Sequence, residues 1–253
     1  EHDCYCTTCV RSGTCQLQKV ANDLNIFRNE YETRIERNKP HGDFPLVRDA
    51  GRCIKCMRCI QVCDKVQALH VWEVQNTGSR TTVAVKEHKK LWETDCSLCG
   101  QCITHCPTGA LRERDDTHRV YEALADQSKI TVVQFAPAVR TAWAESLGLS
   151  KELATEKRMV AAAKALGFNY VFDTDFSADL TIMEEGSEFL DRLQNGGTLP
   201  LMTSCCPGWV RFLKGQYPEF TDNLSTAKSP QQMFGAVTKS YFAKLIGVRP
   251  ENI

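Results

Sequence analysis

One pattern of cysteines occurs twice in this sequence, and it restricts what the chain can fold around. The first copy lies in GRCIKCMRCIQVC and the second in TDCSLCGQCITHCP. Both copies have the spacing C-x2-C-x2-C-x3-C, which keeps three thiols close together and places a fourth slightly further along. The thiols are Cys53, Cys56, Cys59 and Cys63 in the first copy and Cys96, Cys99, Cys102 and Cys106 in the second. Thiols spaced in this way serve either as disulfide partners or as ligands of metal centres.

The spacing favours iron–sulfur clusters. Two such runs are the pattern of bacterial ferredoxins with two [4Fe–4S] clusters, in which the fourth cysteine of each run ligates the other cluster. The expected ligand sets are Cys53, Cys56, Cys59 and Cys106 for one cluster, and Cys63, Cys96, Cys99 and Cys102 for the other. Asp64 stands where the pattern expects a proline, but that proline shapes a turn and is not a ligand. Two zinc sites are the alternative, although paired C-x2-C-x2-C runs are not the usual zinc spacing.

Composition argues against several other classes of protein. The chain has 253 residues, 14 cysteines and an apolar content of 42%, which is enough for a packed core. A disulfide scaffold is the other reading of the cysteines, but it suits small secreted domains. The net charge of zero gives no reason to expect nucleic acid or an anionic membrane as partner. We expect no membrane span, because no apolar run approaches ~18 residues.

The N-terminal residues hold another group of possible metal ligands, namely His2, Cys6, Cys9 and Cys15. One histidine with three cysteines suits either zinc or a third [4Fe–4S] cluster, and spacing alone leaves both open. The two clusters expected downstream favour a third relay centre. We expect Cys4 to be a spare thiol in a loop. The opening EHDCYCTTCV does not resemble a signal peptide and lacks a starting methionine, so we expect a piece of a longer protein.

Apolar periodicity divides the rest of the chain. Residues 17–27 read as a short helix, followed by a polar stretch that ends in a loop over 38–45, and two short strands are expected at 70–74 and 81–85. After about residue 128, strands and helices alternate, which is typical of a parallel, doubly wound sheet. The expected strands are 130–136, 169–175 and 199–204, and the expected helices are 138–147, 151–166, 178–194, a helix opening at Pro207, and 230–246. Ligands of such a sheet bind beyond the carboxyl ends of its strands.

The predicted fold class is therefore α+β with several domains. We expect a small His/Cys cluster domain at 1–48 and a ferredoxin-like domain with two [4Fe–4S] clusters at 49–127. Residues 128–253 are expected to form the first part of an α/β domain with a parallel sheet.

Two adjacent cysteines, Cys205 and Cys206 in TSCCPGWV, follow the last expected strand. A disulfide between neighbours is strained, and both sulfurs cannot comfortably reach one metal ion. A division of labour is expected, with one sulfur on a metal and the other in a different role.

Taken with the upstream clusters, TSCCPGWV resembles the first of three active-site motifs of [FeFe]-hydrogenases. FAPAVR, DLTIMEE and KSPQQMFG look like the same family's surrounding segments. In that family the active centre is the H-cluster, a [4Fe–4S] cube joined through a cysteine to a diiron unit. The resemblance implies that Cys206 ligates the cube and that Cys205 passes protons to and from the diiron unit. A free cysteine has a pKa near 8.5, so it is mostly protonated at neutral pH and able to donate.

The resemblance also implies a route for protons. Glu185, Glu188 and Arg192 fall on one face of a helix, and spacing alone reads them as a solvated face with an ordinary ion pair. In the family pattern, residues matching these three and Ser225 form the proton route behind the thiol. Pro137 and Gln231 match segments that line the pocket of the diiron unit.

The implied function is reversible hydrogen chemistry, 2H⁺ + 2e⁻ ⇌ H₂, in the cytoplasm. The implied partners are ferredoxin or electron-transfer subunits and H-cluster maturation proteins. The cluster of Cys63, Cys96, Cys99 and Cys102 is expected nearest the active site. The family's second and third motifs, a Met-Pro-Cys and a further Cys-x3-Cys, do not follow TSCCPGWV in this sequence. We therefore expect a fragment with three [4Fe–4S] clusters, the H-cluster being completed only in the longer protein. The alternatives are a pure electron-transfer module and a hydrogen-sensing relative, against which Cys205 argues.

Overall fold

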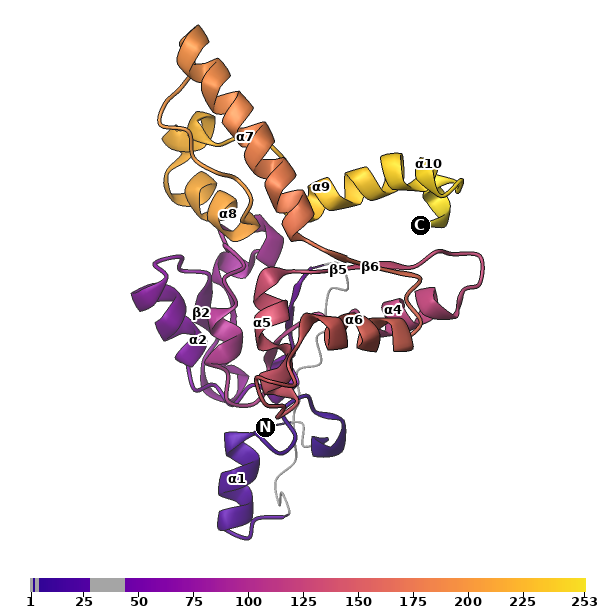
Figure 1. Ribbon diagram of the computed structural model, residues 1–253. Coiled ribbons are helices and arrows are strands. Elements are labelled where there is room, and N and C mark those ends of the chain that lie inside the picture. The colour runs from indigo at the N-terminus through magenta and orange to yellow at the C-terminus, as the bar shows by residue number, and fades with distance from the viewer. Residues whose placement is uncertain (1, 3–4, 28–43) are drawn as a thin grey trace. The chain divides into compact units, whose positions relative to one another are not determined.

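The computed structural model describes residue 2, residues 5–27 and residues 44–253 (Figure 1). The chain forms two compact units. Unit 1 comprises Glu1–Asp115 with Arg211–Pro218, and unit 2 comprises Asp116–Val210 with Glu219–Ile253. Cys4 and most of the loop expected over 38–45 lie outside the described residues. Among the helices that the structure describes, none combines the length and the apolar character needed to cross a bilayer.

The N-terminal part of unit 1 contains α1 (Gln16–Asp23) after a 3-10 turn at Cys6–Thr8. The predicted helix at 17–27 is confirmed, but it ends before residue 27. Asn25 has a φ of 53°, in the left-handed region that does not continue a helix.

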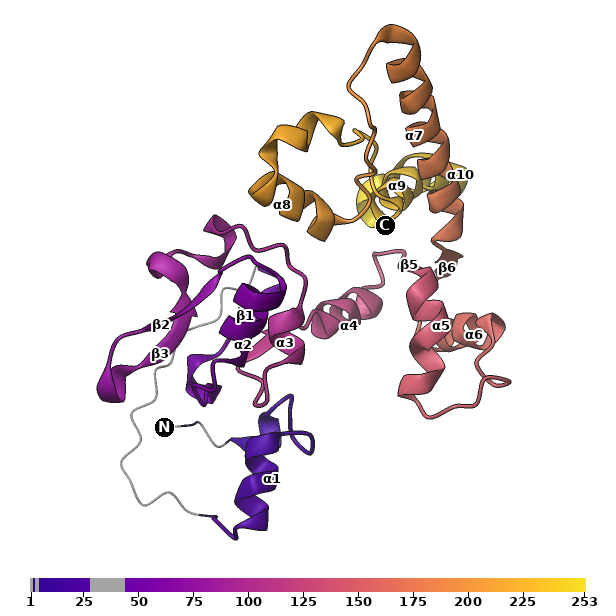
Figure 2. The ribbon, with the colours of Figure 1, turned by 90° about the vertical axis from the view of Figure 1, so that its left-hand side faces the viewer.

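The ferredoxin-like part of unit 1 contains two antiparallel strand pairs. The first is β1 (Leu46–Arg48) with β4 (Leu111–Glu113). The second is β2 (Trp72–Gln75) with β3 (Thr82–Val85), which lie side by side in Figure 2. The second pair confirms the strands predicted from alternating apolar residues. The first pair was not predicted, because strands of three residues are too short to show a period.

The internal repeat of the sequence recurs as a repeat of backbone structure. A short helix begins just before the third cysteine of each run, namely α2 (Arg58–Gln61) and α3 (Gln101–Thr104). Each helix is entered through a left-handed residue, Met57 with φ 60° and Gly100 with φ 73°. This turn allows three closely spaced cysteines to face one point instead of running along a strand.

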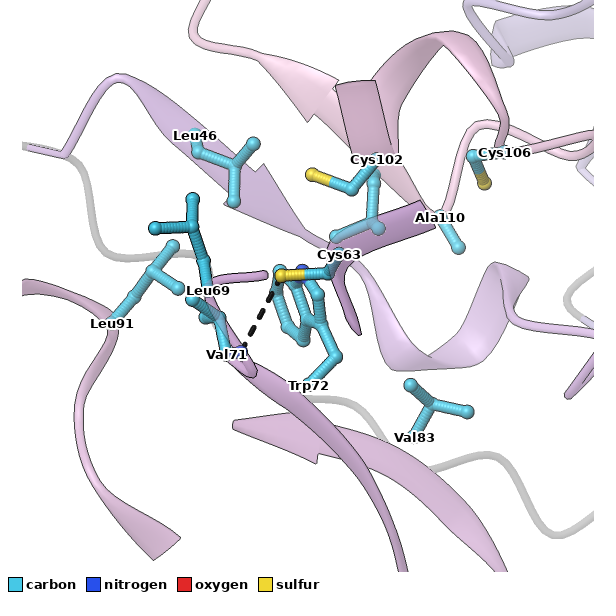
Figure 3. Close-up of a cluster of buried hydrophobic side chains, with 11 residues drawn as sticks. Leu46, Cys63, Leu69, Val71, Trp72, Val83, Leu91, Cys102, Cys106 and Ala110 are labelled. Carbon is cyan, nitrogen blue, oxygen red and sulfur yellow. Dashed lines mark hydrogen bonds between the residues drawn. The ribbon is translucent and has the colours of Figure 1, made fainter. Parts of the chain in front are cut away.

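The buried centre of unit 1 combines aliphatic side chains with cysteines (Figure 3). Trp72 has only 3% of its surface exposed, and it belongs to one buried cluster with seven aliphatic or alanine side chains and three cysteines. The thiols in this cluster are Cys63, Cys102 and Cys106. These three cysteines therefore lie in the interior of the unit, whereas Cys56 and Cys99 are exposed.

Unit 2 is built around two parallel strands, β5 (Val132–Phe135) and β6 (Tyr170–Asp173). The chain enters through α4 (Thr117–Ala125). The crossover between the strands contains α5 (Pro137–Ser146) and α6 (Glu156–Ala165), each close to its predicted range. Proline at the first position of α5 and a Thr155 hydroxyl that accepts from the Arg158 backbone N–H at the start of α6 explain where these helices begin.

The long helix α7 (Asp175–Asn195) follows β6 and ends at Gly196, which has a φ of 75°. The last helix was predicted as one segment over 230–246. It is divided into α9 (Pro230–Val237), a π-helical turn (Thr238–Phe242) and α10 (Ala243–Leu245). Phe234 and Phe242 of this segment pack edge-on or tilted against Tyr170 and Phe172 of β6.

The predicted strand at 199–204 is wrong. Only Met202 pairs, through an isolated parallel bridge to Leu224. Pro200, which follows a cis peptide bond, has no N–H to donate to a ladder, so the apolar run cannot join the sheet. Within the described part of the chain, the expected doubly wound sheet is therefore represented by β5 and β6. The helix that opens at Pro207 is confirmed as α8 (Pro207–Gln216).

Candidate metal centres and active site

The cysteines of unit 1 gather around two cavities. The first cavity is lined by Cys53, Cys56, Cys59 and Cys106, together with Arg48 and Trp72. The second is lined by Cys63, Cys96, Cys99 and Cys102, again with Trp72. Each cavity thus receives three cysteines from one run and the fourth from the other run. The fold brings together the same two sets of four that the sequence predicted as crossed ligands.

Backbone amides point at some of these sulfurs. The N–H of Lys55 donates to Cys53 Sγ at 3.4 Å, and the N–H of Val71 donates to Cys63 Sγ at 3.4 Å (Figure 3). Donors in these places stabilise negative charge on sulfur, as a metal-bound thiolate requires.

Burial has the opposite effect on the free thiols. It raises the pKa of Cys59 and of Cys102 to about 12, and for Cys102 the neighbouring thiols Cys96 and Cys99 add to the rise while a hydrogen bond from the Trp72 side chain opposes it. At neutral pH these thiols are therefore protonated when free. A metal centre that binds them as thiolates must therefore displace these protons.

The two cavities fit clusters better than single ions. Among residue 2, residues 5–27 and residues 44–253, no three His, Cys, Asp or Glu side chains converge closely enough to hold one metal ion. A cuboidal [4Fe–4S] cluster binds each thiol through a different iron, so its ligands surround a space instead of meeting at a point. The thirteen described cysteines are all free thiols.

The N-terminal group lies against the ferredoxin-like part of unit 1. Cys9 Sγ lies 3.9 Å from the carbonyl oxygen of Thr108, and Arg11 donates to the carbonyl of Ile103 at 3.1 Å. A Cβ on Gly109 would lie only 2.9 Å from Cγ of Arg11, so this contact is close. The other expected ligands are His2, Cys6 and Cys15, all half-buried.

The thiol pair Cys205 and Cys206 is exposed and directly precedes α8. The neighbouring Ser204 is held from two sides. Its N–H donates to Glu185 Oε1 at 3.5 Å, and its hydroxyl donates to the carbonyl of Ala227 at 3.1 Å. The predicted residue Glu185 is thus hydrogen-bonded next to the thiol pair.

The other residues of the predicted proton route form one hydrogen-bonded group. Arg192 donates to Glu188 Oε1 at 2.6 Å, and the Ser225 hydroxyl donates to Glu188 Oε2 at 2.7 Å. The Glu188 and Arg192 side chains are only 17% and 13% exposed. The solvated helix face that spacing alone suggested is therefore wrong for this pair.

The electrostatics of Glu188 follow from its donors. Burial acts to raise the pKa of this carboxyl, but hydrogen bonds from Ser225, Arg192 and the backbone N–H of Thr226 outweigh it, so the pKa is lowered. Ser225 also connects this group to the thiol loop, because its hydroxyl accepts from the N–H of Ala227, whose carbonyl holds Ser204.

The two predicted pocket residues lie at neighbouring helix starts. Pro137 is the first residue of α5, directly after β5, and Gln231 lies in the first turn of α9. Both are exposed. The side-chain amide of Gln134 in β5 donates to the carbonyl of Gln231 at 3.5 Å, which places α9 beside the strand.

Sequence reasoning missed several residues that shape these sites. Trp72 lines both four-cysteine cavities, and its only sequence signal was membership of an alternating strand. Arg211 of α8 donates to backbone carbonyls in the second cysteine run, a contact without any local pattern. Arg140 bridges α5 to Asp173 and Asp175, which anchors the crossover to the end of β6.

Three regions match known protein families. Residues 129–253 match the C-terminal domain of the iron-only hydrogenase large subunit, and residues 52–110 match a 4Fe-4S dicluster domain. Residues 1–30 match the iron–sulfur binding region of NADH-ubiquinone oxidoreductase-G. With the two four-cysteine cavities, these matches define an iron–sulfur oxidoreductase.

Individual relatives show which kind of iron–sulfur protein the chain is similar to. The NADP-reducing hydrogenase subunit HndD of Solidesulfovibrio fructosivorans is 46% identical over 260 residues, covering 100% of this chain and 44% of that protein. Iron hydrogenase 1 of Clostridium pasteurianum is 36% identical over 259 residues, with the same two coverages of 100% and 44%. A solved structure of a variant of the [FeFe]-hydrogenase HydA1 from Chlamydomonas reinhardtii is 44% identical, with a TM-score of 0.52 over 55% of this chain and 36% of that one.

The chain belongs to the [FeFe]-hydrogenase family, as the TSCCPGWV motif predicted. A ferredoxin-like [4Fe–4S] domain and a part of the hydrogenase domain, with mixed helices and strands and a parallel strand pair, agree with the fold class that the sequence predicted. The chain spans 44% of the length of the two curated relatives.

Proposed function

We propose that this chain is the electron-relay part and the first part of the catalytic domain of an [FeFe]-hydrogenase, which catalyses 2H⁺ + 2e⁻ ⇌ H₂. The observation that carries this proposal is the hydrogen-bonded group behind the thiol loop, which contains Ser204, Glu185, Ser225, Glu188 and Arg192. An electron-transfer module needs cysteine-lined cavities but has no use for such a group.

The electron relay in unit 1 is assigned to the crossed ligand sets. One cluster is held by Cys53, Cys56, Cys59 and Cys106, and the other by Cys63, Cys96, Cys99 and Cys102. The four thiols around each cavity and the amide donors to Cys53 and Cys63 support this assignment. When bound, the [4Fe–4S] clusters supply low-potential one-electron chemistry and the H-cluster supplies the place where protons and electrons combine.

The N-terminal residues His2, Cys6, Cys9 and Cys15 are assigned to a third [4Fe–4S] cluster. The match of residues 1–30 to an iron–sulfur binding region favours this assignment over zinc. Cys9 lies beside Thr108, which follows Cys106 by two residues and lines the first cavity, and this supports a third relay centre in the same unit.

Unit 2 is assigned the proton chemistry. Cys206 is the one thiol here that would ligate the H-cluster cube, and Cys205 would exchange protons with the substrate. Glu185 would take the proton next, and Ser225, Glu188 and Arg192 would carry it away from the thiol loop. Pro137 and Gln231 would line the pocket of the diiron unit. All four H-cluster thiols are needed for this chemistry, so it belongs to the longer protein.

The domain boundaries 1–48, 49–127 and 128–253, a cytoplasmic location, and electron exchange with ferredoxin or electron-transfer subunits complete the proposal. H-cluster maturation proteins would supply the active centre. An electron-transfer subunit without a catalytic centre of its own is the second candidate. It is favoured by the two complete sets of four thiols around the cavities of unit 1, because electron transfer needs no further centre.

The test is Cys205→Ser in the complete protein. Serine keeps the size of the side chain but is a far weaker acid, so proton exchange should be interrupted while the clusters remain. We expect hydrogen evolution to fall by about 100-fold or more with unchanged iron content. Cys206→Ser is the matched control and should lower the iron content. Unchanged hydrogen evolution in Cys205→Ser would exclude the proton role of this thiol. Absence of hydrogen evolution from the complete wild-type protein would favour the electron-transfer candidate.

A further inference from the structure

A cation from α8 is fixed against the second cysteine run. The Arg211 Nε donates to the carbonyl oxygen of Cys96 at 2.7 Å, and its Nη2 donates to the carbonyl oxygen of Thr94 at 3.3 Å. These contacts lie within unit 1, to which Arg211 belongs. Two hydrogen bonds to neighbouring carbonyls hold the guanidinium plane in one orientation. The position of its positive charge relative to the second cysteine run is therefore fixed.

In the described part of the chain, Arg211 is hydrogen-bonded to carbonyl oxygens, and the ion pairs given there involve other basic side chains. The Asp95 side chain packs against α8 at Gly215, so a carboxylate also lies near this helix. The Arg211 side chain is half-buried, so its field is screened less than that of a surface arginine.

Negative charge on a cluster and its thiolates increases by one unit when the cluster accepts an electron. A fixed cation beside one thiolate therefore stabilises the reduced state more than the oxidised state and raises the reduction potential. Net charge and second-shell contacts are among the levers by which proteins set such potentials.

We propose that Arg211 raises the reduction potential of the cluster held by Cys63, Cys96, Cys99 and Cys102. It thereby favours the electron on this cluster of the relay. This inference rests on the ligand assignment made under the proposed function. Arg211 lies in α8, which begins directly after Cys206. One short segment thus carries both the proposed cube ligand and the residue that sets how readily this relay cluster holds an electron.

The other four-cysteine cavity offers a matched comparison. Arg48 lines that cavity, and its Nη2 donates to the Thr82 hydroxyl at 2.9 Å. Replacing one arginine or the other should therefore shift one cluster at a time.

The experiment is a redox titration of the full chain, reconstituted with iron and sulfide and monitored by electron paramagnetic resonance, with dithionite as electron donor. The variants are Arg211→Gln, Arg211→Lys and Arg48→Gln. Cys99→Ser identifies the spectrum of the cluster in question, because it alters that signal alone. Iron content is measured for every variant.

We expect Arg211→Gln to lower that midpoint by about 59 mV, which is a tenfold change in a one-electron equilibrium. Arg211→Lys should keep most of the wild-type potential, because the charge remains. Arg48→Gln should leave this midpoint unchanged and lower that of the other cluster.

Three results would overturn the inference. An unchanged midpoint in Arg211→Gln with full iron content would show that the charge has no effect. Equal shifts in Arg211→Gln and Arg211→Lys, or loss of iron in both, would show that Arg211 only supports the loop through Thr94 and Cys96. Wild-type protein without the two cluster signals would instead refute the ligand assignment itself, and with it the inference.

Discussion

At the scale of single residues, Glu188 has the spacing of a solvated helix face, but the fold makes its side chain half-buried. The carboxylate accepts from a guanidinium, a hydroxyl and a backbone amide, from Arg192, Ser225 and Thr226. Arg192 in turn donates to the carbonyls of Thr198, Asp222 and Leu224. The pair therefore ties α7 to the segment that precedes α9, and the proposed proton route uses the same atoms that stabilise this region.

The lowered pKa of Glu188 predicts a pH-dependent contribution to stability. A carboxyl whose pKa is lower in the folded state stabilises the fold above its unfolded pKa of ~4.3, and this contribution disappears as the pH falls through the folded value. We expect Glu188→Gln to lower the free energy of unfolding by about 1–3 kcal/mol at pH 7, because charged hydrogen bonds are lost. The difference from wild type should shrink below pH 4.

Urea unfolding at pH 7 and below pH 4 measures this difference in the free energy of unfolding between variant and wild type. Loss of acid-labile iron affects variant and wild type equally and cancels in the comparison. Glu184→Gln is the control, because Glu184 is an exposed neighbour on the same helix. A pH-independent difference, or an equal effect in the control, would mean that the charge of Glu188 does not contribute.

At the scale of elements, the two cysteine runs owe their similarity to backbone turns. Lys55 and Leu98 have φ values of 57° and 59°, and Met57 and Gly100 repeat the left-handed conformation two residues later. Residues other than glycine adopt this backbone conformation only when the surrounding structure enforces it. A bound cluster would supply that enforcement, since each left-handed residue lies between two of the expected ligands.

Gly109 predicts how the N-terminal loop is attached. It has a φ of 71°, and an added Cβ would lie 2.9 Å from Arg11 Cγ and 3.2 Å from Val10 Cγ2. Gly109→Ala should therefore destabilise the protein through backbone strain and also push the loop of residues 5–15 away. Gly78→Ala is the matched control, because Gly78 has a φ of 60° but no atom within 4 Å of an added Cβ.

Both glycine variants should share a backbone cost of about 1–2 kcal/mol in the free energy of unfolding. Only Gly109→Ala should accelerate cleavage within residues 5–15 under limited proteolysis. Equal cleavage rates in the two variants would contradict the close packing of this loop.

At the scale of the whole molecule, the structure predicts a metal inventory. Three [4Fe–4S] clusters correspond to about twelve irons in the reconstituted chain. About eight irons with one zinc would overturn the third cluster at His2, Cys6, Cys9 and Cys15. Iron and zinc are counted together by plasma mass spectrometry on the same sample.

The crossing of the ligand sets has its own test in the same measurement. With Cys53, Cys56 and Cys59 all changed to alanine, about four irons should be lost. In that background, Cys63→Ala should remove about four more, because Cys63 serves the remaining cluster, whereas Cys106→Ala should remove none. The reverse result would mean that each run holds its own cluster.

Much of the fold was readable locally. Alternating apolar residues predicted β2 and β3, and proline or capping residues located the starts of α5, α8 and α9. The strand predictions failed where pairing with a distant segment, and not the local sequence, decides whether a strand forms. The run at 199–204 is apolar enough for a strand, but Pro200 cannot donate and Leu224 offers only a bridge to Met202. β1 and β4 pair with each other, but each has three residues, which is too short for an alternating pattern to predict a strand.

The sequence by itself determined the chemistry of this protein, because thiol spacing fixes which metal centre a short loop can surround, and the TSCCPGWV motif identified the family. Tertiary structure alone decided which residues act on those centres. Trp72 lines both cavities, Glu188 and Arg192 form a half-buried pair instead of a solvated one, and Arg211 donates to the carbonyl of Cys96. The physical reason is that ligand spacing is local, whereas burial and electric fields depend on segments far apart in the chain.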